Sequence, residues 1–394
     1  MSGKKNKRLL VIVADDLNRI ITKGEVTRRY YNPDDFFDEV QIIALMDDEL
    51  RDLRRLELTV GSAAMSFSRV GRPPLVSTLG WTGPLLGKWL DEVSGRVSVR
   101  PDLIRTYGLH LNGLAAVELK KRFNIPLVAS VHEVGDRYKK LEIKTCKHPV
   151  KKLLLALYAA RTHRLAVQTL GRCDEVLCVY QSTADYVERL GYRDPKIIYN
   201  AVSTEILPKQ SYGLHSPPRL LNVGRQTPGI KGPSNIIPAL EGLEAVMDVI
   251  GDGPLHGELV RLAAEAGLQE QVNFSSFMPN EEIVSRMRDY DLFVYQYNNW
   301  EISKSVIEAL LCGLPVIVNR KEDHPVREFE NAPHLVTVRN SPAAFRQAIL
   351  DLLAHDGRRQ ELGEKAREFA SRNYDPPSLE KKVADLYRAL VGRA

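Results

Sequence analysis

Long hydrophobic runs are missing from this sequence, and cysteine is scarce. No run of eighteen or more apolar residues occurs among the 394, so no segment is predicted to cross a bilayer as a helix. The apolar run from Leu9 to Ala14 is too short for a signal-peptide core and is predicted to be a first buried strand. The four cysteines form no CxxC pair and no cluster with histidines, which argues against a disulfide framework or a structural zinc site. We therefore expect a cytoplasmic protein.

Positive and negative charges nearly balance over the whole chain, with a net charge of +5, but they are distributed unevenly along it. Between Arg137 and Arg172, ten lysines and arginines accompany one acid, Glu142. This segment, 137–172, also contains Leu-rich helical stretches. It is predicted either to lie on an anionic membrane surface, on the inner face, or to be a core-facing helix with solvated lysines. No nucleic-acid recognition motif accompanies it, so no nucleic-acid partner is expected.

The chain is too long for one ordinary core, and its hydrophobic pattern predicts two domains. Short apolar runs alternate with helical stretches, first over 8–200 and again over 219–319, which is typical of parallel sheets covered on both faces. A stretch rich in Ser, Pro and Gly, 203–218, is predicted to be the linker. We expect an α/β protein with two doubly wound, Rossmann-like domains facing across a cleft. The first is 1–205 with a closing helix, 377–394, that returns to it, and the second is 206–376.

The first chemical motif follows the predicted strand 219–224. Gly224 ends that strand, and Arg225 and Lys231 follow in a loop that contains Pro228 and Gly229. Ligands of such sheets bind at the carboxyl ends of the strands, and two cations on a glycine-containing loop there suit a diphosphate. The alternative is a solvated loop with surface cations. A helix is predicted to follow over 234–243.

The second motif is the stretch 298–319. Ser305 and Glu308 have the spacing of a capping box, Gly313 suits the end of a helix, and Pro315 prevents its continuation. A helix is therefore predicted over 306–312, and its first turn, next to Lys304, could hold an anion. Glu308 either accepts hydroxyl protons from a sugar or merely caps its helix.

Taken together and in order, these blocks resemble the nucleotide-sugar half of GT-B glycosyltransferases, specifically the retaining family 4. The resemblance is carried by "VGRQTPGIKG", "VIGDGPLHGEL", "VNFSSFMPNEEIVSRMRDYDLFVYQ" and "EISKSVIEALLCGLPVIVN", and covers about 219–375 well. The first half is similar more loosely. The resemblance implies transfer of a sugar from a nucleoside-diphosphate sugar, with UDP or GDP, to a hydroxyl of a glycan or lipid-linked acceptor.

The resemblance also implies residue roles. Arg225 and Lys231 would hold the diphosphate, Glu308 the ribose hydroxyls, and Phe277 and Met278 the base. The implied donor-binding set is Gly224, Arg225, Lys231, Phe277, Met278, Ser303, Lys304, Ser305, Val306 and Glu308. The implied catalytic set is His132, Arg225, Lys231 and Glu301, with His132 approaching the donor sugar from the first domain. Lys23 and Gly24 are candidates for acceptor contact, because they follow the first strand.

The sequence departs from the family pattern at one glutamate. The family places its first glutamate eight residues before the second, but Trp300 occupies that position and Glu301 lies seven residues before Glu308. Either Glu301 takes the role through a small loop shift, or the sugar end of the site is built differently.

No metal and no cofactor are expected. The DxD of Asp289 and Asp291 is predicted to end a helix and start a strand, away from the site. Arg225, Lys231 and the helix start can meet the diphosphate charge. Two other functions stay open at this point: a sugar-nucleotide epimerase of the same fold, and a non-catalytic nucleotide-sugar-binding protein.

Overall fold

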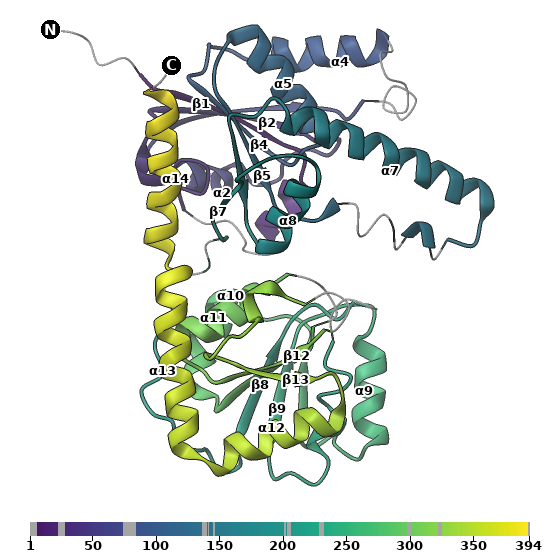
Figure 1. Ribbon diagram of the computed structural model, residues 1–394, viewed down its shortest axis with the longest axis vertical. Coiled ribbons are helices and arrows are strands. Elements are labelled where there is room, and N and C mark those ends of the chain that lie inside the picture. Colours follow the sequence, from purple (N-terminus) through teal and green to yellow (C-terminus); the bar gives the residue numbers. More distant parts are fainter. Residues whose placement is uncertain are drawn as a thin grey trace, which may run out of the picture. The chain divides into compact units, whose positions relative to one another are not determined.

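A computed structural model describes residues 6–22, 28–73, 84–135, 140, 142–144, 146–200, 202, 206–227, 232–297, 301–321 and 325–392. The chain divides into two compact units (Figure 1). The first is Met1–Tyr199 with Pro377–Ala394, and the second is Asn200–Pro376.

The first unit is built on a parallel seven-stranded sheet, in the order β3-β2-β1-β4-β5-β6-β7. The central strands β1, β4, β5 and β6 are largely buried on both faces, as is typical of a parallel sheet covered by helices on both sides. The strands are β1 (Arg8–Val13), β2 (Glu39–Leu45), β3 (Ala64–Val70), β4 (Leu103–Tyr107), β5 (Leu127–Val131), β6 (Glu175–Cys178) and β7 (Lys196–Ile197). The helices are α1 (Leu17–Thr22), α2 (Leu53–Glu57), α4 (Pro84–Gly95), α5 (Leu111–Phe123), α7 (Pro149–Leu170), α8 (Gln181–Arg189) and α14 (Pro376–Val391).

The two faces of β1 enter different cores, as side chains alternate along a strand. Leu10 and Ile12 pack with residues of α4 and α5. Leu9 and Val11 pack in the core that includes Tyr387 of α14. The C-terminal helix therefore completes the first unit, as the sequence predicted.

The second unit carries a parallel six-stranded sheet, in the order β10-β9-β8-β11-β12-β13. Its strands are β8 (Arg219–Val223), β9 (Val246–Ile250), β10 (Val272–Ser275), β11 (Leu292–Tyr295), β12 (Val316–Arg320) and β13 (Val336–Arg339). Its α-helices are α9 (His256–Glu265), α10 (Asn280–Arg286), α11 (Lys304–Cys312), α12 (Pro342–Ala354) and α13 (Asp356–Asn373). Since the strand order reverses between β8 and β11, ligands are expected at the carboxyl ends of these two strands. The prediction of two doubly wound, Rossmann-like α/β domains is confirmed.

The prediction of a helix over 234–243 is wrong. Residues 234–237 form turns, and a short 3₁₀ helix, η3 (Pro238–Leu240), follows. Pro238 has no N–H to donate within an α-helix, and Gly242 adopts a positive φ of 68°.

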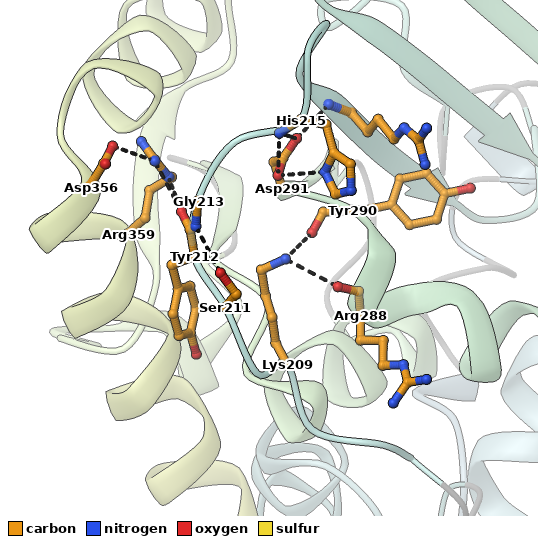
Figure 2. A network of polar contacts seen from close by, with 11 residues as sticks. Lys209, Ser211, Tyr212, Gly213, His215, Arg288, Tyr290, Asp291, Asp356 and Arg359 are labelled. Atoms are coloured by element: carbon orange, nitrogen blue, oxygen red, sulfur yellow. Dashed lines mark hydrogen bonds and ion pairs between the residues drawn. The ribbon is translucent and has the colours of Figure 1, made fainter.

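The stretch predicted to be a linker is partly a strap bound to the second unit. Figure 2 shows its residues 209–215 tied to α13 and to the segment before β11. Lys209 is buried, and its ammonium donates to the carbonyls of Arg288 (3.1 Å) and Tyr290 (2.6 Å). The buried guanidinium of Arg359 donates to the Tyr212 carbonyl (3.0 and 3.2 Å). The strap thus holds one end of the unit whose opposite, carboxyl edge carries the candidate site.

Candidate functional site

The candidate site begins at the carboxyl end of β8, on the switch point of the second sheet. Gly224 follows β8 directly, and its N–H donates to the Ile250 carbonyl at the end of β9 (3.0 Å). Arg225 comes next and is exposed. The structure thus presents this guanidinium at the edge where a ligand of such a sheet binds.

Glycines let the loops after β8 and β9 lie backbone against backbone. Gly251 has a φ of +141°, and a Cβ there would lie 2.1 Å from the Gly224 carbonyl oxygen. A Cβ at Gly253 would meet the Gln226 carbonyl at the same distance. The buried Gln226 side chain closes the arrangement by donating to the Gly251 carbonyl (2.8 Å). Close approach of the two loops fixes the direction in which Arg225 leaves the sheet.

Helix α11 begins two residues earlier than predicted, so the expected capping box is wrong. Ser303 is the N-cap, and Ser305 lies inside the first turn. The Ser305 hydroxyl donates to the Val223 carbonyl of β8 (2.8 Å) instead of capping the helix. The N–H of Val306 donates to the Ser303 carbonyl (3.0 Å), so the first-turn N–H groups shift to Lys304 and Ser305. Ser305 thereby joins the start of α11 to the end of β8.

Glu308 is buried one turn into α11, at 3% exposure. One of its carboxylate oxygens accepts from the Asn280 amide (3.0 Å) at the start of α10. Burial raises the pKa of Glu308 to about 7, although the Asn280 hydrogen bond and the charge of Lys304 act to lower it. Further hydrogen-bond donors would stabilise the ionised form of this buried carboxyl group, and the hydroxyls of a sugar are such donors.

The loop after β10 supplies Phe277 and Met278. Phe277 is 71% exposed, which is unusual for a large aromatic side chain, and Met278 is partly buried. The loop leads directly to Asn280 and hence to Glu308. An exposed aromatic ring on the loop that also leads to the partner of Glu308 suits a planar base.

Several predicted residues cannot be placed. Lys231, Lys23 and Gly24 lie outside the described residues, as does Trp300. Glu301 is described; it is partly buried and lies three residues before α11 begins.

His132 lies in the first unit, immediately after β5. Its ring lies against that of Tyr107 at the end of β4, with centroids 5.5 Å apart. Both residues line a cavity of about 520 Å³ at the carboxyl ends of β1, β4 and β5, which Asp15 and Arg161 also line. The predicted contact of His132 with a donor sugar stays a prediction.

The DxD lies at the other end of the second sheet. Asp289 ends a 3₁₀ helix, η4 (Met287–Asp289), and Asp291 precedes β11. The buried Asp291 carboxylate accepts from the Arg219 N–H (2.7 Å) and contacts His215 Nδ1 (3.0 Å), as Figure 2 shows. Asp291 is thus engaged in holding the strap.

Two family models match this chain, one on each unit. The family model described as "Glycosyl transferases group 1" matches residues 205–369, and the one described as "Glycosyltransferase Family 4" matches residues 38–206. The second unit thus resembles group 1 glycosyl transferases, and the first unit resembles glycosyltransferases of family 4.

The sequence relatives of this chain are distant. An uncharacterized glycosyltransferase of Methanocaldococcus jannaschii is 24% identical over 276 residues, 69% of this chain and 71% of the relative. A GDP-mannose-dependent alpha-(1-6)-phosphatidylinositol monomannoside mannosyltransferase of Mycolicibacterium smegmatis is 26% identical over 190 residues. That match covers 45% of this chain and half of the relative.

A solved structure shows the same fold along the whole chain. The Anabaena HepE protein, solved in complex with UDP, aligns with a TM-score of 0.71 at 17% identity. The alignment covers 98% of this chain and all of that one. At 17% identity this structural similarity establishes the fold alone, which is GT-B.

Two residues of the candidate site do not stand out in the sequence. Asn280 is the first residue of α10, and its amide donates to a carboxylate 28 positions along the chain, which no local pattern indicates. Tyr295 ends β11, and its buried ring lies so close to Gly224 that a Cβ there would be 3.0 Å from it. No pattern in the sequence points to Tyr295, because its contact with Gly224 depends on the pairing of β8 with β11.

Proposed function

We propose that this protein transfers a sugar, with retention of configuration, from a nucleoside-diphosphate sugar to a hydroxyl acceptor. The observation that carries the proposal is the group of residues at the switch point of the second sheet. Arg225 follows the end of β8, Ser305 ties the start of α11 to that end, and Glu308 lies buried three residues after Ser305 in the same helix.

The diphosphate would bind between Arg225 and the first turn of α11. Arginine can hold two oxygens in a planar fork, and the first-turn N–H groups of a helix attract anions. Lys304 and Lys231 would add positive charge. As the bond from the sugar to the diphosphate breaks, negative charge grows on the leaving group, and these preorganised groups stabilise it. We expect transfer to proceed in the presence of EDTA because this charge is met by the protein.

The nucleoside would bind between Glu308 and Phe277. Glu308 would accept both ribose hydroxyl protons, while Phe277 and Met278 would meet the base. HepE was solved with UDP, and the Mycolicibacterium relative is named as GDP-mannose-dependent, so UDP and GDP are the bases to test first.

The acceptor hydroxyl would attack the oxocarbenium-like sugar that departure of the diphosphate leaves. The acceptor we propose is a glycan or a lipid-linked molecule, bound in the cavity of the first unit beside His132. The Mycolicibacterium relative is named for a phosphatidylinositol monomannoside, which is consistent with this class. The protein would act at the inner face of a membrane. Within the described part of the chain, no helix is both long and apolar enough to span one.

The first experiment is a thermal-shift series with UDP-, GDP-, ADP- and dTDP-sugars. A bound ligand raises the unfolding temperature by mass action, so one base should stand out. Arg225→Ala and Glu308→Gln should reduce that shift, whereas Arg261→Ala on the exposed side of α9 should keep it. A shift that survives in both site variants would place the donor elsewhere.

Product analysis separates transfer from the other reactions. The labelled donor that binds is incubated with glycan and lipid-linked acceptors, and transfer predicts a glycosylated product with the donor's anomeric configuration. An epimerised donor would instead indicate an isomerase. Donor binding without any product would indicate a binding protein.

A further inference from the structure

Helix α7 leaves an apolar face uncovered on the first unit. The helix is 22 residues long, and in Figure 1 it extends well away from the sheet. Its second half is packed, since Leu165, Ala166 and Leu170 are buried. Its first half, 149–160, contains no buried residue. At 1.5 Å per residue this half is about 18 Å long.

Four aliphatic side chains form one stripe on this half. They are Val150, Leu153, Leu154 and Leu157, spaced so that they share one side of the helix. Their exposed fractions are 60%, 62%, 49% and 52%. Single exposed leucines are common on proteins, but a contiguous stripe of this kind marks an interaction surface.

Cations border the stripe. Lys151 and Lys152 lie on the same helical turns and are exposed, and Lys140, Lys144 and Lys147 precede the helix. The only acid between residues 140 and 160 is Glu142. An apolar stripe beside lysines matches an anionic bilayer surface, where leucines enter the acyl boundary and lysines remain at the headgroups.

The charge pattern disfavours a second copy of the chain as the occupant. Two such helices packed by their stripes in a symmetric pair would bring lysines 151 and 152 of both copies together. Like charges in this position repel, and the segment offers a single carboxylate to offset them.

We propose that the first half of α7 is an interfacial anchor that docks on anionic lipid headgroups. The same helix continues into the wall of the first unit's cavity, which Tyr158, Arg161 and Leu165 line. Docking would therefore bring the cavity to the lipid surface, where a lipid-linked acceptor resides. This last consequence rests on the proposed function, but the docking itself does not.

The test is co-sedimentation of the full chain with vesicles. Vesicles of phosphatidylcholine containing 30% phosphatidylglycerol should bind the protein, and pure phosphatidylcholine should bind it much less. Leu153→Gln with Leu157→Gln should reduce the partition coefficient at least about tenfold. Leu58→Gln with Leu85→Gln, two equally exposed leucines elsewhere, should keep it.

The charge contribution is tested separately. Lys151→Gln with Lys152→Gln should weaken binding and reduce its salt dependence, whereas Lys121→Gln with Arg122→Gln on the exposed side of α5 should not. The docking proposal is overturned if wild type fails to bind anionic vesicles. It is also overturned if light scattering detects a dimer of the wild type that the leucine variant loses, while vesicle binding stays unchanged.

Thermal shifts with nucleotide sugars distinguish the two proposals. The docking variants should keep the shift of the wild type, because α7 belongs to the first unit and the donor residues to the second. If the protein binds vesicles but no nucleotide sugar, the docking proposal stands and the proposed transferase function is refuted.

Discussion

At the scale of single residues, Glu308 is a carboxyl group whose chemistry is changed by burial. Its pKa is raised to about 7, so below this pH much of the folded protein carries it protonated. Only the ionised form accepts hydrogen bonds from both ribose hydroxyls. We expect donor affinity to weaken as the pH falls through 7, and Glu308→Gln to weaken it about ten- to a hundredfold at pH 8. Calorimetric titration from pH 5.5 to 8.5 should show a slope for wild type and none for the variant.

The raised pKa of Glu308 changes folding stability with pH in the direction opposite to its effect on donor affinity. An acid whose folded pKa lies above its unfolded value destabilises the fold as the pH rises from about 4.5 to about 7. At pH 8 the ligand-free Glu308→Gln variant should therefore be more stable than wild type, by up to about 3 kcal/mol. A variant that binds donor poorly and is also less stable would instead indicate a structural role for the carboxylate.

His334 is a second buried titratable residue, and it predicts acid sensitivity. The imidazole is 3% exposed and stacks on Phe369 with centroids 3.7 Å apart. Burial lowers its pKa to about 4. The unfolded chain takes up this proton near pH 6.5, so folding stability falls as the pH drops from 6.5 to 4, by up to about 3 kcal/mol. His334→Phe keeps the stacking, and its unfolding temperature should fall less over this range; an equal fall would contradict the assignment.

At the scale of elements, the contact between the loops after β8 and β9 decides how the site is presented. Gly251→Ala would place a Cβ 2.1 Å from the Gly224 carbonyl in a conformation that alanine rarely adopts. We expect a loss of roughly 1–3 kcal/mol in stability, together with weaker donor binding. Gly257 in α9 is the matched control, since a Cβ there meets nothing within 4 Å. Gly257→Ala should leave donor binding unchanged and raise stability by about 0.5–1 kcal/mol.

At the scale of the whole molecule, the end of the chain stabilises its beginning. Tyr387 of α14 is fully buried in the core of the first sheet, and the buried Arg105 of β4 donates to its hydroxyl. Tyr387→Ala should cost about 3–5 kcal/mol, because it leaves a cavity and removes the partner of a buried cation. Calorimetry should show the loss in the transition that nucleotide does not shift. Lys382→Ala, on the exposed side of α14, should change neither transition.

Much of the architecture was predictable because short apolar strands are local signals. The strands β1 and β8 fall where the apolar runs 9–14 and 219–224 predicted them. β3 was missed, since only its last residue, Val70, is fully buried and the strand lacks an apolar run. The strap was mistaken for a linker, because Ser, Pro and Gly indicate irregular backbone and say nothing of what that backbone binds.

Local sequence patterns alone were enough to predict the class of fold and the residues at the end of β8 and at the start of α11. These follow from periodicity, glycine positions and the order of motifs, which are properties of neighbouring residues. Tertiary structure alone decided the rest: that Ser305 binds β8 rather than capping its helix, that Glu308 pairs with Asn280, and that half of α7 lies uncovered. The reason is physical. Burial and hydrogen-bond partners depend on residues tens of positions away, and only the packed chain brings these into contact.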